Sequence, residues 1–241
     1  MILRRVEGHL GVPLLGASRV ELEAWWDARL EEVSARSASI ELANVRAWYQ
    51  WAVTFEHRAD DPTGRIRRPR YQRCLPRPIP EPDLVLALDH APERVRPMLL
   101  LAAYAGLRAC EIAGLRGEHL SDEAVFVADG KGGRQRIVPM HPKVAAELVP
   151  ARSGWVFPHL DGRAGPVRPH RVSHLCNGYL HAIGLPQTLH QLRHRFGTET
   201  YRACSDIRVV QELMGHADPA TTAGYAAHSV ARAAEAVRNL S

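Results

Sequence analysis

Apolar residues recur at helical spacing after an irregular start. Residues 1–17 contain three glycines and a proline and show no clear period, so we expect no regular helix there. Ser18 and Glu21 form a capping-box pattern that predicts a helix to about Ser34, with a buried face of Val20, Leu22, Trp25, Trp26 and Leu30. A second helix is predicted from Ser39, with an apolar face of Ile40, Leu42, Val45, Trp48, Tyr49, Ala52 and Phe55.

These elements predict a small helical unit over residues 1–64, shortened because one helix is missing or degraded in residues 1–17. Two interpretations stay open. The unit is either a helical hairpin that only packs, or a DNA clamp with Arg36, Arg46 and Arg58 on one face.

A basic linker follows over residues 65–80. Prolines are so frequent between Asp61 and Asp83 that neither a helix nor a central strand is expected. The same stretch carries Arg65, Arg67, Arg68, Arg70, Arg73 and Arg77. It is either a solvated linker or an extended strap that lies along a phosphate backbone.

The remaining chain, residues 81–241, is predicted to be mostly helical with one small β-hairpin. Strand-like residues 124–127 and 136–138 flank a glycine-rich tip that contains Lys131. Helices are expected near 81–90, 93–105, 109–115, 142–149, 170–183, 189–203, 206–214, 218–227 and 229–239.

Composition indicates a globular protein with a polyanionic partner. The chain has 241 residues, 46% of them hydrophobic and 24% charged, and no apolar run approaches the roughly 20 residues that cross a bilayer. We therefore expect a cytoplasmic protein without membrane contact. Four dispersed cysteines lack the spacing of a zinc or redox motif and are expected to be reduced.

Positive charge is concentrated in the larger part of the chain. Residues 1–64 hold 7 Lys and Arg against 10 Asp and Glu, a net charge of −3, whereas residues 65–241 hold 24 against 16, a net charge of +8. Such a basic surface suits nucleic acid, although it says nothing about the fold. The negative balance of residues 1–64 weakens their interpretation as a clamp.

The sequence matches neither a nucleotide-binding P-loop nor a zinc-protease motif. The string Gly130-Lys131-Gly132-Gly133 is not a phosphate-binding P-loop, because glycine follows the lysine and two strands flank the loop. Taken alone, it is a mobile hairpin tip or a lysine on a flexible arm. His190 and His194 share a helix face, but Gln191 replaces the glutamate of a zinc-protease motif, so no metal is expected.

Other candidates are ambiguous when each is taken alone. Arg108 follows a turn glycine and starts a short helix, where it would either face solvent or grip a phosphate. Glu111 either braces that arginine or is a surface acid. Tyr225 is either a packed helix aromatic or a nucleophile surrounded by small side chains.

Taken together, these residues resemble the tyrosine recombinase, or phage integrase, family. The matching strings are Ala105-Gly106-Leu107-Arg108-Ala109-Cys110-Glu111-Ile112, Gly130-Lys131-Gly132, His190-Gln191-Leu192-Arg193-His194, Leu213-Met214-Gly215-His216, and Thr221-Thr222 leading to Tyr225. The resemblance covers residues 75–241 strongly and 18–70 loosely. It implies a two-lobed fold with a core-type DNA-binding domain and a catalytic domain.

The resemblance also implies a role for each matching residue. Arg108 and Arg193 would clamp the scissile phosphate, and Tyr225 would attack it to form a 3′-phosphotyrosine link. Lys131 would protonate the leaving 5′-oxygen. His190 would transfer protons with the tyrosine, His216 would bind a phosphate oxygen, and Glu111 would support the arginines. This chemistry needs no metal, ATP or other cofactor.

The implied protein is a site-specific recombinase of a phage or mobile element that acts on double-stranded DNA. It would be a homotetramer on paired core sites and a monomer or weak dimer when free. We expect no additional N-terminal arm-site domain of the kind that many phage integrases carry, and therefore action on short core sites. The stretch Val230–Leu240 would pack on its own domain or on a neighbouring protomer. A cleavage-deficient DNA-binding regulator and a topoisomerase remain alternatives.

Overall fold

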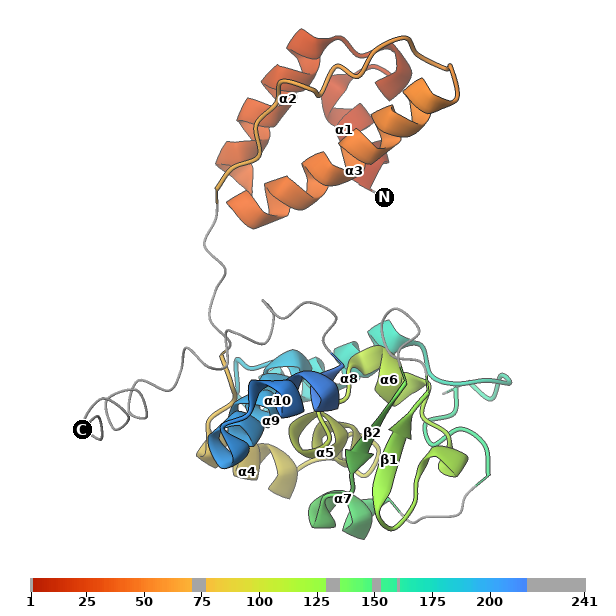
Figure 1. Cartoon of the computed structure of the whole chain (residues 1–241), viewed down its shortest axis with the longest axis vertical. Helices are drawn as coiled ribbons and strands as arrows, with labels where there is room; N and C mark the ends of the chain where they lie inside the picture. Colours follow the sequence, from red (N-terminus) through yellow and green to blue (C-terminus); the bar gives the residue numbers. More distant parts are fainter. Residues whose placement is uncertain (1, 71–76, 129–134, 149–152, 160, 216–241) are drawn as a thin grey trace, which may run out of the picture. The chain divides into compact units, whose positions relative to one another are not determined.

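The computed structural model describes residues 2–70, 77–128, 135–148, 153–159 and 161–215. The helices expected near 218–227 and 229–239 lie outside these residues. The chain divides into two compact units, Met1–Cys74 and Leu75–Ser241, each with its own hydrophobic core (Figure 1).

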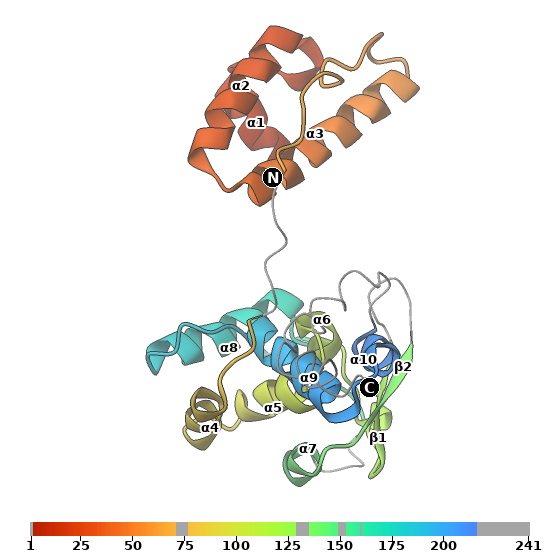
Figure 2. The same ribbon diagram turned by 60° about the vertical axis from the view of Figure 1, so that its left-hand side comes forward.

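The first unit is helical. Its elements are α1 (Ile2–Leu10), the short 3₁₀ helix η1 (Leu14–Gly16), α2 (Arg19–Glu32) and α3 (Ala35–Thr54). Ser18 caps α2 in the expected capping box, with the Glu21 carboxylate accepting from the backbone of Ser18 at 2.7 Å. Both α2 and α3 pack against α1, and the three helices surround one core (Figure 2).

The expectation for residues 1–17 is wrong, because they form α1 and η1 and contribute to the core. Val6 and Leu14 are buried, and the hydroxyl of Tyr49 donates to the Leu14 carbonyl at 2.7 Å. Gly8 is tolerated within the helix, and Gly11 follows it at a φ of +70°, a conformation that glycine adopts without strain. Residues 1–17 therefore contain a helix that sequence patterning did not predict.

Helical periodicity predicted more buried residues in α2 and α3 than the structure shows. Leu22, Trp25 and Trp26 of α2 are buried as expected, but Val20 and Leu30 are exposed. Ile40 of α3 and Phe55, which follows the helix, are also exposed. This helix begins at Ala35 rather than Ser39, because Ser34 caps it by accepting from the backbone N–H of Ser37.

A buried carboxylate joins α2 to α3 in this unit. The side chain of Glu41 is only 8% exposed and accepts two hydrogen bonds from Arg29, at 2.7 and 2.9 Å. Arg5 of α1 adds a third at 3.0 Å. The carboxylate thus connects all three helices.

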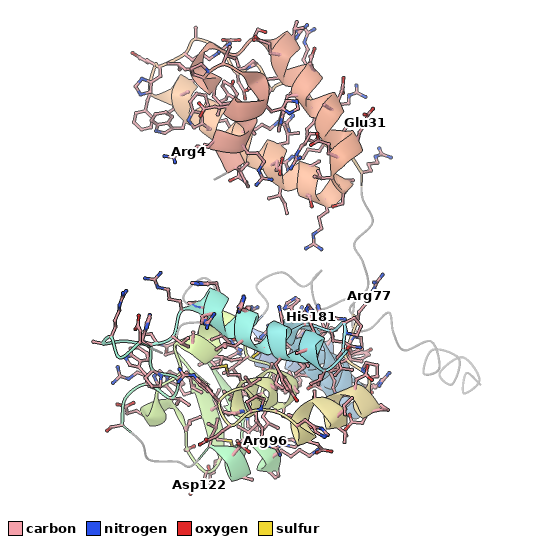
Figure 3. The ribbon with its side chains drawn as sticks, turned by 180° about the vertical axis from the view of Figure 1, so that it is seen from behind. Arg4, Glu31, Arg77, Arg96, Asp122 and His181 are labelled. Atoms are coloured by element: carbon pink, nitrogen blue, oxygen red, sulfur yellow. The ribbon has the colours of Figure 1, made fainter. Side chains whose placement is uncertain are left out.

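The basic linker is anchored at both described ends. Ile66 is buried in the first core, and the Arg46 guanidinium donates to the carbonyls of Thr63 and Ile66. Ile79 is buried in the second core. Residues 65–70 and 77–80 form neither helix nor strand, as expected. Arg77 is exposed and projects from its unit (Figure 3).

The second unit is mostly helical with one antiparallel hairpin. Its elements are α4 (Glu81–Asp89), α5 (Arg96–Tyr104), α6 (Ala109–Ala113), η2 (Gly117–His119), β1 (Ala124–Val127), β2 (Arg136–Pro139), α7 (Pro142–Glu147), α8 (Pro169–Ala182), α9 (Leu189–Cys204) and α10 (Ile207–Met214). The predicted fold class is confirmed, including the hairpin.

Four packing contacts between elements position the candidate site residues of the second unit. Helix α5 is almost entirely buried and packs against α9, while α6 packs against α8 (Figure 2). Helix α10 packs against both α9 and β2. In the hairpin, Val127 at the end of β1 pairs with Arg136 at the start of β2. The start of β2 therefore lies beside α10.

None of the helices within the described residues is both long and apolar enough to cross a membrane.

We expect Glu41→Gln to destabilise the first unit by about 2 kcal/mol at pH 7, because it removes the charge that offsets the Arg29 guanidinium. The matched control is Glu32→Gln. It removes a contact with the same guanidinium from a side chain that is 54% exposed and should cost less than about 1 kcal/mol. Denaturant unfolding followed by tryptophan fluorescence measures both, since four of the five tryptophans lie in this unit.

The effect of Glu41 should depend on pH. Hydrogen bonds from Arg29 lower the pKa of Glu41, against the opposing effect of burial. A carboxylate with a lowered pKa stabilises the fold above its unfolded-state pKa and loses that contribution as the pH falls. The difference between wild type and Glu41→Gln should therefore shrink below about pH 4.3. A difference that is unchanged at pH 3, or an equal cost for both variants, would contradict this account.

Candidate functional site

A single buried carboxylate organises the candidate site. Glu111 lies in the first turn of α6, and its side chain is 1% exposed. The backbone N–H of Arg108, just before the helix, donates to Glu111 Oε2 at 2.7 Å. This local contact fixes the start of α6 and aims the carboxylate into the unit's interior.

Arg136 grips the same carboxylate from the hairpin. Its two terminal nitrogens donate to the two oxygens of Glu111, each at 2.8 Å, in a bidentate ion pair. Its third nitrogen, Nε, donates to the carbonyl of Leu213 at 2.7 Å. One guanidinium therefore ties β2 to both α6 and α10.

Arg108 contacts Glu111 and remains partly open to solvent. Its Nη1 lies 2.9 Å from Glu111 Oε1, and its Nη2 donates to the carbonyl of Gly215 at 3.2 Å. The side chain is 21% exposed. It can therefore reach a ligand while staying anchored.

Arg193 approaches from α9 and is the most deeply buried of the three arginines, at 2% exposed. Its guanidinium donates to the carbonyls of Gly106 and Met214, the latter at 2.5 Å. The same group lies 3.7 Å from Glu111 Oε2. Arg108 and Arg193 thus converge on one carboxylate although they are far apart in the sequence.

The end of α10 is held by all three arginines. Three consecutive carbonyls, of Leu213, Met214 and Gly215, each accept from a different guanidinium. The last carbonyls of a helix lack partners within the helix and carry partial negative charge, so cations stabilise them. The chain leaves α10 from a fixed position.

The cluster carries excess positive charge. Burial alone would raise the pKa of Glu111, but hydrogen bonds and charge from Arg136, a hydrogen bond from the Arg108 backbone and the charge of Arg193 lower it to about 2. The carboxylate is therefore ionised at neutral pH and offsets one of three guanidinium charges. The remaining charge favours a bound anion.

Arg108, His190 and Arg193 line one cavity of about 380 Å³, together with His170 and Ser173 of α8. A phosphate group is small enough to fit there. The imidazole rings of His190 and His194 lie 4.4 Å apart. Burial, then the charges of His190 and Arg193, lowers the pKa of His194 to about 4, so His194 is neutral at pH 7.

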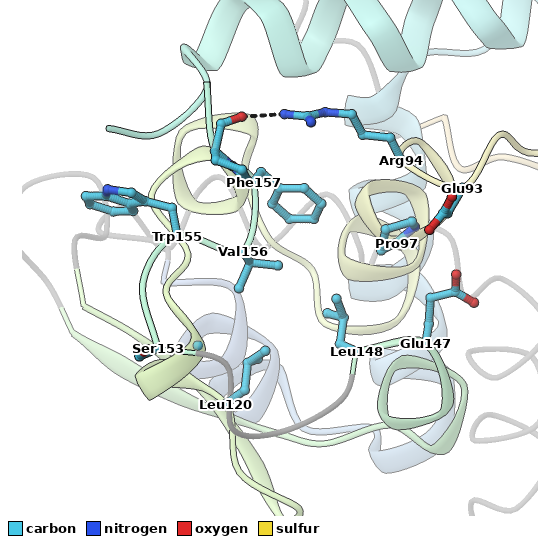
Figure 4. A pocket seen from close by; sticks show the side chains of 12 residues that line it. Glu93, Arg94, Pro97, Leu120, Glu147, Leu148, Ser153, Trp155, Val156 and Phe157 are labelled. Atoms are coloured by element: carbon cyan, nitrogen blue, oxygen red, sulfur yellow. Dashed lines mark hydrogen bonds between the residues drawn. The ribbon is translucent and has the colours of Figure 1, made fainter. Parts of the chain in front are cut away.

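A larger cavity, of about 590 Å³, contains none of the predicted site residues. It is bordered by Glu93, Glu147 and Trp155, and Arg94 donates to the Pro158 carbonyl at its edge (Figure 4). No group of three His, Cys, Asp or Glu side chains within the described residues is arranged to hold a metal ion. The predicted site residues Arg108, His190 and Arg193 line the smaller of these two cavities.

The structure brings together four of the predicted site residues, namely Arg108, Glu111, His190 and Arg193. Lys131, His216 and Tyr225 lie outside the described residues. Sequence reasoning missed Arg136, which sits in an otherwise apolar strand with a side chain only 7% exposed. An arginine at the start of a short strand was the available signal, but its partners are distant in sequence.

The predicted DNA-binding arginines differ in their surroundings. Arg36 is exposed, whereas Arg46 is half-buried and donates to backbone carbonyls of its own unit. Arg73 lies outside the described residues. The remaining members of the set are exposed, namely Arg65, Arg67, Arg68 and Arg70.

The second unit matches a known family. Residues 81–232 fit the model of the Phage integrase family. Tyrosine recombinase XerD of Caulobacter vibrioides is 32% identical over 240 residues, covering 89% of this chain and 78% of the relative. Tyrosine recombinase XerC of Xylella fastidiosa is 32% identical over 227 residues, covering 88% and 77%. The resemblance inferred from the motifs is confirmed.

Solved structures agree on the fold. The integrase from mycobacterium phage Brujita is 34% identical with a TM-score of 0.54, covering 89% of this chain and 75% of that one. A lambda integrase dimer bound to a COC' core site has a TM-score of 0.69 at 18% identity, covering 89% and 65%. The latter likeness concerns the fold alone.

We expect Gly106→Ala to destabilise the second unit by about 2 kcal/mol or more. Gly106 has a φ of +63°, and a Cβ atom there would lie 2.3 Å from the Phe196 ring. The matched control is Gly178→Ala in α8, where nothing lies within 4 Å of the new Cβ, so the helix should gain about 0.5–1 kcal/mol. Calorimetry of the full chain measures both shifts, and a stable Gly106→Ala variant would contradict this account.

Proposed function

We propose that this chain, which belongs to the phage integrase family of tyrosine recombinases, cuts DNA strands and rejoins them through a 3′-phosphotyrosine intermediate. One observation carries the proposal. Arg108 and Arg193 share the carboxylate Glu111 and line the same cavity, which is large enough for a phosphate. Paired guanidiniums fit the transition state of phosphoryl transfer, because they stabilise charge on the equatorial oxygens.

In this mechanism the phenol oxygen of Tyr225 attacks phosphorus, and the bond from phosphorus to the 5′-oxygen breaks. His190 accepts the phenol proton, and Lys131 gives a proton to the departing 5′-oxygen. His216 donates a hydrogen bond to a phosphate oxygen. The reverse attack by a 5′-hydroxyl from another strand restores the phosphodiester and frees the tyrosine, so no external energy source is consumed.

His190 suits proton transfer because it lines the cavity beside Arg108 and Arg193. The neighbouring His194 has a pKa near 4 and so adds no positive charge at pH 7 that would oppose protonation of His190. Two guanidiniums beside the phosphate also favour the phenolate form of an approaching tyrosine.

We further propose double-stranded DNA as the partner, with the first unit and the basic linker holding core sites and four protomers joining two sites. The exposed arginines from Arg65 to Arg70 supply contacts to the phosphate backbone. A lambda integrase of similar fold has been solved as a tetramer bound to a Holliday junction. That assembly supports a tetramer here.

We further propose that the protein integrates the DNA of a phage or other mobile element. The likeness to a mycobacterium phage integrase at 34% identity favours it. Relatives named XerC and XerD, at 32% identity, favour a chromosomal role instead. Assays on paired sites distinguish the two, because integration joins separate molecules whereas resolution acts on repeated sites within one.

We expect Tyr225→Phe to abolish the covalent protein–DNA band on a nicked suicide duplex, because phenylalanine lacks the attacking oxygen. A substrate is first obtained by covalent capture from nicked duplexes of random sequence. The control is Tyr179→Phe, which removes a hydroxyl that donates to the Ala87 carbonyl at 2.9 Å and should cleave normally. A band that persists in Tyr225→Phe would exclude this nucleophile.

We expect Lys131→Ala to slow cleavage of an ordinary phosphodiester by about 100-fold. It should slow a 5′-bridging phosphorothiolate far less, because a thiolate leaves without a proton. The control is Lys143→Ala, which removes the other lysine of the chain. Single-turnover assays measure both cleavage rates. If Lys131→Ala slows cleavage of both substrates equally, the lysine is not the general acid.

The same assays separate the alternatives. A DNA-binding regulator would capture no DNA covalently, although it would still shift a labelled duplex. A topoisomerase would relax supercoiled DNA but yield no recombinant product when both partner sites are supplied. The proposed function requires a covalent band and a recombinant product together.

A further inference from the structure

We propose that Arg136 is a positioning residue for strand cleavage, which acts by fixing the point where the chain leaves α10. The inference rests on the proposed function, because its consequence is the placement of the segment that carries His216 and Tyr225. Arg136 would not touch the DNA itself.

The contacts of Arg136 place it between the catalytic candidates and α10. Its Nη1 and Nη2 hold the two oxygens of Glu111, and its Nε holds the Leu213 carbonyl. Glu111 in turn contacts Arg108 and Arg193. A rigid planar guanidinium thus sets the spacing between the phosphate-binding arginines and the end of α10.

Close packing reinforces this contact at the residue that ends the helix. Gly215 has a φ of +60°, and a Cβ atom there would lie 3.1 Å from Arg136 Nη1. The guanidinium therefore lies directly against the backbone where the chain leaves α10. His216 follows at the next position, and Tyr225 lies ten residues after Gly215.

Arg136 differs from the two other arginines in its access to the cavity. Arg108 and Arg193 line the cavity of about 380 Å³, whereas Arg136 is not among the described residues that line it. Its side chain is only 7% exposed. Its influence on the phosphate must therefore pass through Glu111 and α10.

Lysine cannot reproduce this geometry. A lysine ammonium is a single nitrogen on a flexible stem, so it cannot span a carboxylate and a carbonyl as the guanidinium does. Arg136→Lys keeps the charge beside Glu111 but loses the fixed link to Leu213. It is the most conservative change that tests position rather than charge.

The test is a single-turnover cleavage assay of Arg136→Lys at saturating suicide duplex. We expect the rate constant for covalent complex formation to fall by about 30–100-fold, because small misplacements of reacting groups cost rates of this order. The equilibrium affinity for an uncleavable duplex should stay within about threefold, since most phosphate contacts are unchanged. A rate constant within twofold of wild type would overturn the proposal.

Amplitude and rate separate positioning from simple loss of folding. Partial unfolding would reduce the fraction of molecules that cleave, without changing the rate constant of the folded ones. Positioning predicts a lower rate constant with a normal amplitude. A reduced amplitude with a wild-type rate constant would therefore show that Arg136 only stabilises the fold.

A second substrate identifies the group that Arg136 positions. If Arg136 acts through α10, the slowing should persist on the 5′-bridging phosphorothiolate, which needs no proton from Lys131. If the slowing disappears on that substrate, Arg136 acts through the hairpin lysine, and the proposal is wrong. The matched control is Arg116→Lys, whose guanidinium makes an exposed paired contact with Glu118 and should leave both rates unchanged.

A second variant keeps the proposal testable if Arg136→Lys fails to fold. Gly215→Ala leaves every charge in place but strains the end of α10 and presses on Arg136. It should slow both substrates in the same way, and wild-type rates would contradict the proposal. If wild type cleaves through Tyr225 while these variants cleave normally, this inference fails and the proposed function stands.

Discussion

The structure of the second unit depends on a carboxylate, Glu111, that is buried among three guanidiniums. Each of the four groups would be costly to bury alone, because an unpaired ion loses its hydration without compensation. Together they form a cluster in which Arg136 pairs with both carboxylate oxygens and Arg108 with one. The cluster retains excess positive charge, which the phosphate of the proposed substrate would offset.

The three arginines differ in burial and in the groups that they contact. Arg136 is enclosed and links secondary-structure elements, whereas Arg108 and Arg193 reach the cavity. All three donate to consecutive carbonyls at the end of α10. The site that would hold the phosphate is therefore built from the same interactions that fix the exit of the chain toward Tyr225. In the proposed mechanism, the geometry of phosphate binding and the placement of the nucleophile are therefore coupled.

The sequence predicted the local parts of this structure better than the distant ones. Ser18, Asp61–Asp83 and the hairpin carried their signals in adjacent residues, through capping, proline content and alternation. Helix α1 was not predicted because its glycines argued against a helix and its apolar face is short. The structure nevertheless accommodates Gly8, with open space around its Cβ position. Val20 and Leu30 were placed in the core because periodicity defines a helix face but not where the core ends. Arg136 was missed because its partner Leu213 lies 77 residues away.

Internal contacts also decide which arginines of the first unit remain for DNA. Arg29 is bound to Glu41. Arg46 donates to the carbonyls of Thr63 and Ile66, and Arg58 donates to the carbonyls of Leu15 and Ala17. Donors committed to internal partners gain less from a phosphate, because binding must first break existing hydrogen bonds. For the exposed arginines from Arg65 to Arg70, the described residues offer no internal hydrogen bond that DNA binding would have to break. The net charge of −3 over residues 1–64 acts in the same direction. Phosphate binding by this unit should therefore be concentrated at the linker and at the exposed Arg36, rather than at Arg29, Arg46 or Arg58.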